Sequence, residues 1–425
     1  MLRLVYQFNN LVRLIRFTWI VVFYYGFYRM RRLAKRNPIS SLKSDFSPSD
    51  VTIVCPCVDP DGDFIPAIKS WLRADPHEVL IVTTVGWHGR VKARLESIDD
   101  PRVTVHAIEV KGKRPGLIAG IQRTTTDVVV LLDDDSIWSP ATLQGLLCGL
   151  SAGPRVAGVI NIKVNIRKAR PALAPDAPSL FEAMGAGRHD RRAITNAAMA
   201  YFCDGQLTCC NGRTTAYRTE ALQSPGFVEH VVEDYWKGKY KLASGDDRAI
   251  TRWLYQKGWK TGIVVHDECA MVSRPKGNTD YLKQLLRWSR SEVRQLVRDI
   301  YLLLPSTKTA RKKVWFISLI YPLFLEEHFV FLDLILTSVI IICRAFFESN
   351  VSTVGIPSNF LLLLQYLGTS ALLELVFNLW HFTRYPEMLR HVLVYALWGQ
   401  VRMVVSLYAL FTLDHSSWLT RTGAA

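Results

Sequence analysis

The sequence predicts an α/β domain built on a parallel sheet, with apolar helices before and after it. Short apolar runs typical of strands alternate with helical segments between residues 51 and 132, and this alternation favours parallel strands. Long apolar runs with few charges lie near both ends of the chain, as in membrane helices. We therefore divide the chain into a membrane helix with a linker (1–48), a large α/β domain (49–300) and a second membrane region (301–425).

The N-terminal region contains a charge-free run of twelve residues, 17–28, which is shorter than the ~20 residues that a span needs. Extending the helix back to Leu11 makes it long enough if Arg13 and Arg16 reach the interface with their charged ends. A helix lying in the interface is the alternative, and we favour the span. The basic cluster 29–36 then lies on the cytosolic side.

The net charge of +15 is compatible with nucleic acid, an anionic membrane face or acidic substrates as partners. Its clusters at 29–36 and 311–313 adjoin apolar runs, which is typical of charges that flank membrane spans. The sequence has no recognisable nucleic-acid-binding module, so we expect no nucleic-acid partner. The N-terminal run lacks a small-residue cleavage site. We therefore expect a cytosolic domain whose eight cysteines are free thiols.

Four strands and two helices are predicted in the first part of the domain. The strands are residues 51–54, 78–83, 103–108 and 127–132, and the helices are 63–72 and 113–121. The fourth strand is apolar throughout, so we expect it to be buried on both faces. Ligands of such sheets bind at the carboxyl ends of the strands. Asp59 follows the first strand and is a candidate partner for the base or ribose of a nucleotide.

Three acids, Asp133, Asp134 and Asp135, stand at the carboxyl end of the fourth strand. They repel one another and destabilise the fold unless a cation neutralises them. A helix N-cap before Pro140 would use one of them but hardly all three. Carboxylate oxygens with open positions suit Mg²⁺ or Mn²⁺ that bridges a diphosphate. We therefore predict a metal–nucleotide site here.

A second acidic pair, Asp246 and Asp247, lies between Gly245 and Arg248. Gly245 allows a sharp turn, and Arg248 begins a helical run whose first N–H groups favour negative charge. One carboxylate there is a candidate general base that the other acid, or Arg248, holds in place. A solvated helix N-cap is the alternative.

Two further motifs follow the same logic. The turn 209–213 lies beside the predicted site. Gln284, Arg287 and Trp288 share one helical face at i, i+3 and i+4. Arg287 suits bidentate phosphate binding, and Trp288 suits stacking on a sugar ring. An amphipathic helix with an ordinary interfacial tryptophan is the alternative. The same helix, 281–304, carries arginines among apolar residues, which favours a position on a membrane face.

The C-terminal region contains two predicted spans, 329–342 and 359–380, each with one acid, Asp333 and Glu374. Acids inside spans tend to face a polar interior, so we expect these two to line a path. The segment 389–413 is long enough to span, but its charges, Arg402 among them, favour the interface. Two spans return the tail to the cytosol, so we favour this reading.

In this order, the motifs resemble those of membrane-integrated family 2 glycosyltransferases, among them the hyaluronan synthases and the short fungal polysaccharide synthases. The resemblance covers roughly residues 50–300 and reappears near the C-terminus. It implies a GT-A (Rossmann-like) catalytic domain in the cytosol, in an integral membrane protein that we place in the plasma membrane. It also implies inverting transfer from a UDP-sugar to a growing glycan, with Mg²⁺ or Mn²⁺ as cofactor.

The resemblance also assigns roles to residues. Asp135 corresponds to the metal ligand, and Asp247 to the catalytic base, with Asp246 and Arg248 beside it. The donor-binding positions are Asp59, Lys113, Arg114, Asp133, Asp134, Arg287, Trp418, Thr420 and Arg421. The acceptor-binding positions are Cys210, Asn211, Gly212, Arg213, Gln284 and Trp288. Trp418, Thr420 and Arg421 occupy the place of a gating loop over the nucleotide.

Two rival functions share parts of this pattern. A non-processive lipid glycosyltransferase of the ceramide type uses the same motif types, but the spans after the catalytic domain and the gating-like tail favour a polymer. A catalytically inactive membrane scaffold is a rival from another class. The presence of every acid and of Gln284, Arg287 and Trp288 favours an enzyme.

Overall fold

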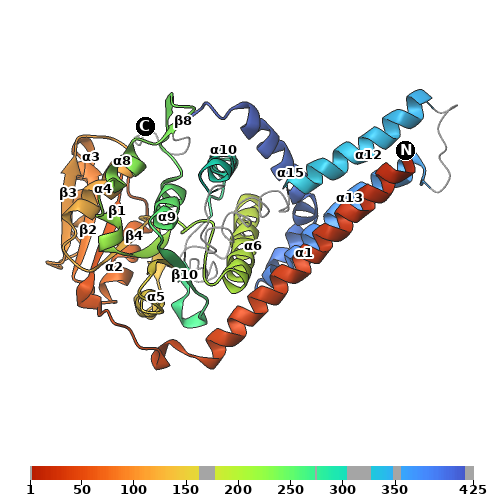
Figure 1. The fold of residues 1–425 in the computed structure, drawn as a ribbon. Helices are drawn as coiled ribbons and strands as arrows, with labels where there is room; N and C mark the ends of the chain where they lie inside the picture. Colours follow the sequence, from red (N-terminus) through yellow and green to blue (C-terminus); the bar gives the residue numbers. More distant parts are fainter. Residues whose placement is uncertain (1, 162–177, 273–274, 304–326, 348–355, 417–425) are drawn as a thin grey trace.

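The computed structural model describes residues 2–161, 178–272, 275–303, 327–347 and 356–416. Figure 1 shows a domain around a sheet, from which a long group of helices projects. The N-terminus lies at the far tip of these helices. The segment 311–313 and the gating-like residues 418–421 lie outside the described residues.

The central sheet has seven strands in the order β10-β6-β7-β4-β1-β2-β3. The strands are β1 (Val51–Pro56), β2 (Glu78–Thr84), β3 (Val103–Ile108), β4 (Val128–Leu132), β6 (Val156–Asn161), β7 (Thr214–Arg218) and β10 (Lys260–Val264). The four predicted strands are therefore confirmed. These four strands pair in parallel, as predicted, whereas β7, which the sequence did not predict, runs antiparallel to both β4 and β6. This reversal places the start of β7 beside the carboxyl end of β4, where Thr214 pairs with Leu132.

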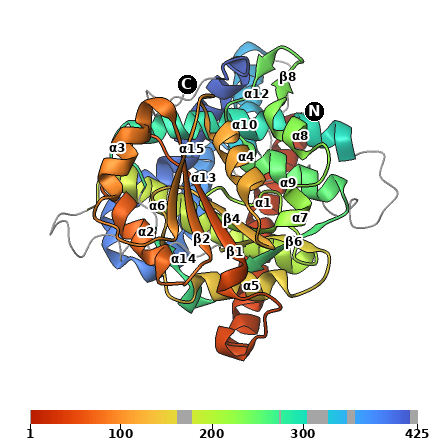
Figure 2. The same ribbon diagram turned by 90° about the vertical axis from the view of Figure 1, so that its left-hand side faces the viewer.

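Helices cover both faces of the sheet. Figure 2 shows α2 (Phe64–Leu72) and α3 (Val85–Leu95) on one side of the strands, and α4 (Lys113–Arg123) and α9 (Asp246–Gln256) on the other. Strand β4 accordingly contributes Val128, Val130 and Leu132 to one apolar core and Val129 and Leu131 to the other. The prediction that this strand is buried on both faces is confirmed.

Two helices, α6 (Leu180–Phe202) and α10 (Asp280–Leu303), lie between the sheet domain and the projecting helices. Helix α6 begins at a capping box, in which Ser179 and Glu182 bond each other's backbone N–H groups. Ile194, Ala197 and Ala198 of α6 share an apolar core with α1 (Leu2–Arg36). Helix α6 therefore joins the sheet domain to the N-terminal helix.

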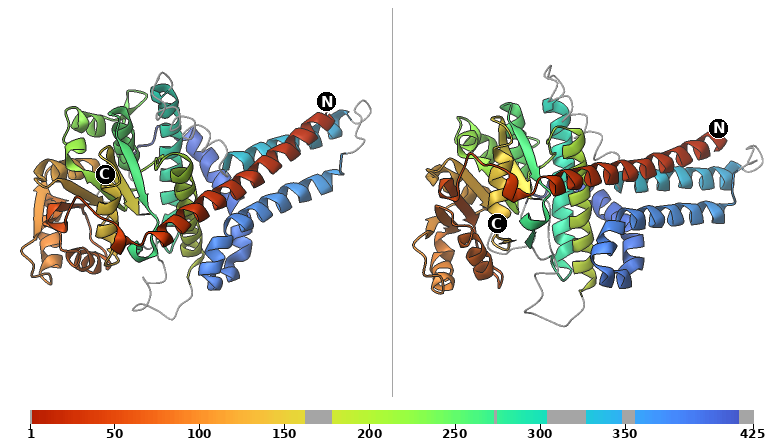
Figure 3. Two further views of the ribbon diagram at one scale, coloured as in Figure 1. Left: turned by 60° about the horizontal axis from the view of Figure 1, so that its bottom comes forward. Right: turned by 90° about the horizontal axis from the view of Figure 1, so that it is seen from below.

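Four helices among the described residues are long and apolar enough to cross a membrane: α1, α12 (Glu327–Phe347), α13 (Asn359–Phe377) and a segment, 386–411, that includes α15 (Val392–Phe411). Figure 3 shows α1, α12 and α13 running side by side away from the sheet domain. We call these three helices and α15 the apolar bundle.

The charges inside the apolar bundle are paired with one another. Arg13 binds Asp333 at 2.7 Å, and Arg16 lies 3.3 Å from Glu374. Glu374 also accepts from Arg402, at 2.8 Å. Breaking such buried pairs is strongly destabilising. The prediction that Arg13 and Arg16 extend to the interface is therefore wrong. The prediction that Asp333 and Glu374 line a path is also wrong, because both carboxylates are buried in these pairs. Arg402 likewise gives no reason to place α15 in the interface.

The arginines of α10 also bind protein groups. Arg290 donates to Thr412 at 3.0 Å, Arg294 donates to the carbonyl of Leu413 at 2.9 Å, and Arg298 pairs with Asp234. These contacts hold the end of α15 and the Asp234 region against α10. The charges of these arginines are therefore paired inside the protein, and the position of α10 on a membrane face stays a prediction.

Candidate active site

A cleft at the carboxyl ends of the central strands collects most of the predicted site residues. Among those that line it are Lys113, Asp133, Asp134, Asp135, Asn211, Gly212, Arg213, Asp246, Asp247, Arg248, Gln284, Arg287 and Trp288. They come from five separate stretches of the chain. Their convergence follows from the topology, since β4 and the turn before β7 meet at one edge of the sheet. The backbone N–H of Asp133 bonds the carbonyl of Arg213 at 3.3 Å there.

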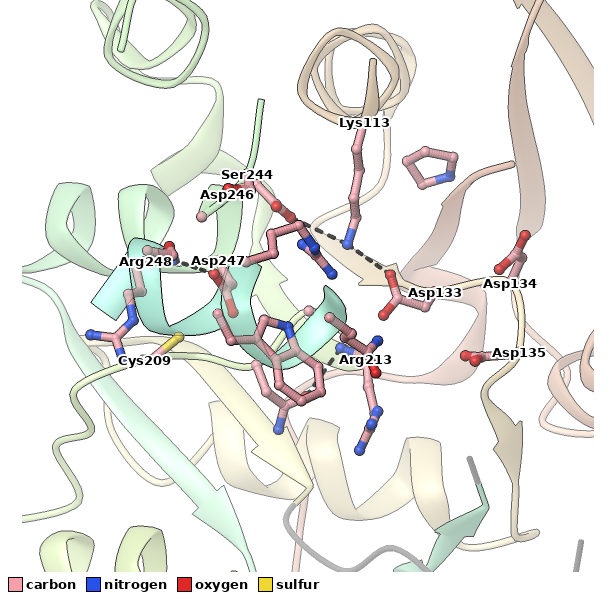
Figure 4. A pocket seen from close by; sticks show the side chains of 18 of the residues that line it. Lys113, Asp133, Asp134, Asp135, Cys209, Arg213, Ser244, Asp246, Asp247 and Arg248 are labelled. Carbon is pink, nitrogen blue, oxygen red and sulfur yellow. Dashed lines mark hydrogen bonds and ion pairs between the residues drawn. The ribbon is translucent and has the colours of Figure 1, made fainter. Parts of the chain in front are cut away.

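Lys113 connects the two acidic motifs. Its Nζ atom lies 2.7 Å from Asp133 and 3.3 Å from Asp246 (Figure 4). Burial alone would lower the pKa of Lys113, but the attraction of Asp133 and Asp246 outweighs it and raises the pKa. The lysine is therefore charged, and it fixes the distance between the motif after β4 and the start of α9.

The acids after β4 have different environments. Asp134 is buried and accepts from the Cys57 thiol at 3.3 Å. Burial and the negative charges of Asp133 and Asp134 raise the pKa of Asp135 to about 7. No group of three His, Cys, Asp or Glu side chains among the described residues could hold a metal ion. The crowding of three carboxyl groups that raises this pKa nevertheless fits a divalent cation, which would stabilise the charged form of Asp135 and take its remaining oxygen ligands from elsewhere.

The second acidic pair sits at the first turn of α9. Gly245 has a φ of 81°, and a Cβ atom there would lie 2.6 Å from Oγ of Ser291, so only glycine fits. Asp246 is buried, and burial opposes its charge, but Lys113 and Arg114 hold its pKa below the usual value. Asp247 is half-buried and faces the cleft, and its Oδ1 accepts from the N–H of Arg248 at 2.8 Å.

The turn before β7 and helix α10 complete the walls. The Arg213 guanidinium contacts Nε2 of His189 at 2.5 Å. Burial lowers the pKa of Arg287, which Asp246 and Asp133 partly oppose. The Arg188 guanidinium lies 4.9 Å from the centre of the Trp288 ring, a cation–π arrangement. The cleft thus combines carboxylates, guanidiniums and one aromatic face.

Of the predicted site residues that the structure describes, three do not line the cleft: Asp59, Arg114 and Cys210. Arg114 is a correction, because its buried guanidinium binds Asp234 at 2.9 Å and the carbonyl of Ser244 at 2.8 Å. It therefore supports the loop that carries Asp246. Cys210 is fully buried, and its neighbour Cys209 lines the cleft instead. Asp59 is exposed, with a φ of 54°.

Sequence reasoning missed several residues of the cleft. Arg188, His189 and Arg192 come from α6, and Glu292 comes from α10. The signal was present: residues 188–192 are a charged run in a helix otherwise rich in alanine and glycine. Trp418, Thr420 and Arg421, predicted to cover the nucleotide, lie outside the described residues.

Comparison with protein families gives a match to the model described as "Glycosyltransferase like family 2" over residues 48–291. A type 2 glycosyltransferase of Zymoseptoria tritici is 26% identical over 395 residues, covering 89% of this chain and 77% of that protein. One of Pyricularia oryzae is 27% identical over 389 residues, covering 91% and 77%. Similarity to hyaluronan synthase 3 of Gallus gallus is confined to 40% of this chain and 32% of that protein, with 26% identity over 190 residues.

Among solved structures, the fold is similar to that of a mannosyltransferase of Pyrobaculum calidifontis in complex with GDP-Man and Mn²⁺. The TM-score is 0.56 at 17% identity, and the match covers 95% of this chain and 98% of the other. At that identity the likeness concerns the fold alone. The α/β domain is therefore of the GT-A type, as predicted.

Proposed function

The chain belongs to glycosyltransferase family 2, and from this premise we propose that it transfers a sugar with inversion from a UDP-sugar to a growing glycan at a membrane. The product is an extracellular or cell-wall polysaccharide, made by a catalytic domain on the cytosolic side of the plasma membrane. The four helices of spanning length support a membrane location. The partial similarity to a hyaluronan synthase supports a polymer.

The observation that carries the proposal is the single cleft shared by Asp135, Asp247 and Trp288. A glycosyltransferase needs a group for the diphosphate, a base for the acceptor hydroxyl and a surface for the acceptor sugar. These three chemistries occur together here. The wall that carries Trp288 belongs to α10, which lies between the sheet domain and the apolar bundle (Figure 1). An acceptor held at this wall is close to the bundle.

In the proposed reaction, Asp247 accepts the proton of the acceptor hydroxyl as its oxygen attacks the anomeric carbon of the donor. The bond from this carbon to the diphosphate breaks, and UDP leaves with the electron pair. A single displacement inverts the configuration. Asp246, fixed by Lys113 at 3.3 Å, keeps the first turn of α9 in place, and Arg248 lies beside Asp247.

The other residues bind and orient the substrates. Lys113 and Arg287 offer positive charge to the diphosphate, and Trp288 stacks on a sugar of the acceptor, with Gln284 and the turn 211–213 beside it. Asp133, Asp134 and Asp135 suit Mg²⁺ or Mn²⁺ through their oxygen atoms and surplus negative charge. When bound, this cation neutralises charge on the diphosphate as it leaves. The Mn²⁺ in the similar mannosyltransferase supports this choice.

The test uses the purified full chain in lipid nanodiscs with a panel of UDP-sugars and Mn²⁺. Release of UDP from one donor, together with a product of many sugar units, is the expected result. If the product is instead a lipid that carries a single sugar, the enzyme makes a glycolipid of the ceramide type and not a polysaccharide. If no donor yields UDP, the chain is a scaffold and the proposal fails.

A further inference from the structure

Three arginines surround one oxygen atom of Glu292 in the cleft. Arg188 and Arg192 of α6 approach Oε1 at 3.5 and 3.2 Å, and Arg248 of α9 approaches it at 3.4 Å. We call these four residues the arginine cluster. Its formal charge is +2, because three guanidiniums share one carboxylate. Charge-assisted bonds are usually shorter, about 2.7–2.9 Å, so these three contacts are long.

The Arg248 side of the arginine cluster lies away from the predicted donor end of the cleft. In Figure 4, Arg248 lies on the opposite side of Asp247 from Asp133, Asp134 and Asp135. Arg188 lies over the Trp288 ring, at 4.9 Å from its centre. The cluster is therefore next to the proposed acceptor surface, and its α6 members belong to the helix that packs against α1.

The surroundings keep this part of the cleft positive. The Arg188 side chain is 9% exposed, so water screens its charge only weakly. Burial, together with the charges of Arg213, Arg188 and Arg192, lowers the pKa of the neighbouring His189 well below its usual value. Arg192 is 33% exposed, which leaves one side of the cluster accessible to a ligand. An anionic group that enters here meets donors already held in place.

We propose that the arginine cluster binds an anionic group of the acceptor, either a uronate carboxylate or the phosphate of a lipid-linked glycan. The inference rests on the proposed glycosyl transfer and adds the charge class of the acceptor. The Glu292 carboxylate holds the guanidiniums together when no acceptor is bound. An acceptor oxygen then shares or takes over these contacts.

The first experiment measures binding without turnover. The full chain in neutral-lipid nanodiscs, with saturating UDP and Mn²⁺ to fill the donor end, is titrated with two matched pairs of probes. The pairs are p-nitrophenyl glucuronide against p-nitrophenyl glucoside, and farnesyl phosphate against farnesol. We expect the anionic member of one pair to bind about tenfold more tightly, and the responding pair identifies the source of the anion.

Two variants separate the proposed role from a structural one, because their expected effects have opposite signs. Arg192→Gln removes one cation and lowers the preference for the anionic probe about tenfold, whereas Glu292→Gln removes the competing carboxylate and raises it. Lys283→Gln is the matched control, since it removes an exposed cation of α10 that does not line the cleft. Arg192→Lys keeps the charge and restores part of the preference.

Equal binding of the anionic and neutral members in both pairs overturns the inference, whatever the enzyme does with UDP-sugars. The inference is also overturned if Arg192→Gln and Glu292→Gln each weaken binding of the anionic and the neutral probe equally. Failure of the proposed function has a different signature: UDP with Mn²⁺ does not raise the melting temperature, and no donor is turned over.

Discussion

At the residue scale, the two neighbouring carboxylates Asp246 and Asp247 have distinct environments. Asp246 is 6% exposed and lies 3.3 Å from Lys113, so its negative charge is already used to hold the site together. Asp247 is half-buried and faces the cleft, held by the N–H of Arg248. Asp246 therefore has a structural role, whereas its neighbour Asp247 is the candidate base.

Asp247→Asn should lower turnover by about 10²–10⁴-fold, the usual contribution of a general base. The amide is nearly the same size, so folding and the KM for the UDP-sugar should change little. Release of UDP and the melting temperature are the measurements. Asp280→Asn, which alters a half-buried carboxylate outside the cleft, controls for the loss of one negative charge. Undiminished transfer by Asp247→Asn would exclude it as the base.

Gly245→Ala should destabilise the protein by about 1–3 kcal/mol, because a side chain at a φ of 81° is strained and its Cβ meets Oγ of Ser291 at 2.6 Å. The double variant Gly245→Ala, Ser291→Gly removes the clash but keeps the strain. We therefore expect it to recover part of the lost stability. Thermal denaturation in detergent measures both, and no recovery would show that the contact with Ser291 is unimportant.

Chelation of divalent cations with EDTA should abolish release of UDP, and added Mn²⁺ should restore it. Asp135→Asn should raise the Mn²⁺ concentration needed for half-maximal activity at least about tenfold, since it removes the proposed ligand. Binding of Mn²⁺ to the UDP complex, followed by electron paramagnetic resonance, gives a readout besides activity. Full activity in EDTA would remove the metal from the proposal.

At the element scale, the contact between α1 and α6 depends on small residues. A Cβ atom at Gly26 would lie 2.8 Å from Cα of Ala198, so the two backbones are close. We expect Gly26→Ala to push the helices apart and to cost about 1–3 kcal/mol. Gly368→Ala on α13 is the matched control, because nothing lies within 4 Å of its Cβ position. Equal melting temperatures for the two variants would contradict this account.

The buried carboxylate of Glu374 joins elements that are far apart in the sequence. It accepts from Arg16 of α1 at 3.3 Å, Arg191 of α6 at 2.5 Å and Arg402 of α15 at 2.8 Å. Glu374→Gln leaves these guanidiniums without their countercharge, and removing one partner of a buried pair costs about 3–5 kcal/mol. We expect a much lower melting temperature in detergent. Glu387→Gln, on an exposed acid, should change it little.

At the scale of the whole molecule, we expect the basic cluster 29–36 to set the orientation in the membrane. This cluster lies at the end of α1 nearest the sheet domain. Positive charge of this kind favours the cytosolic side. A protease site inserted at Gly238, an exposed hairpin tip between β8 (Tyr235–Trp236) and β9 (Tyr240–Lys241), should be cut in inside-out vesicles and protected in sealed right-side-out ones. As the control, the protease should cut the site in both kinds of vesicle once detergent has opened them. The reverse pattern would place the domain outside.

The local pattern was enough to predict the four strands 51–54, 78–83, 103–108 and 127–132, the helix 113–121 and the two acidic motifs of the cleft. The reversed strand β7 was missed because its direction depends on pairing with β4 and β6. The roles of Arg13, Arg16 and Arg114 were misjudged for the same reason. Each pairs with an acid more than a hundred residues away, and spacing along the chain carries no information on such contacts.

The sequence by itself determined the α/β class, the acids at the carboxyl ends of strands and the apolar segments at both ends, because periodicity and local charge are properties of neighbouring residues. Only the tertiary structure decided which charges are neutralised within the protein and which remain at the cleft. That decision depends on distances between elements remote in the chain. In the tertiary structure, Arg114 and Glu374 hold separate elements together through ion pairs. Arg188, Arg192 and Arg248 meet around the carboxylate of Glu292.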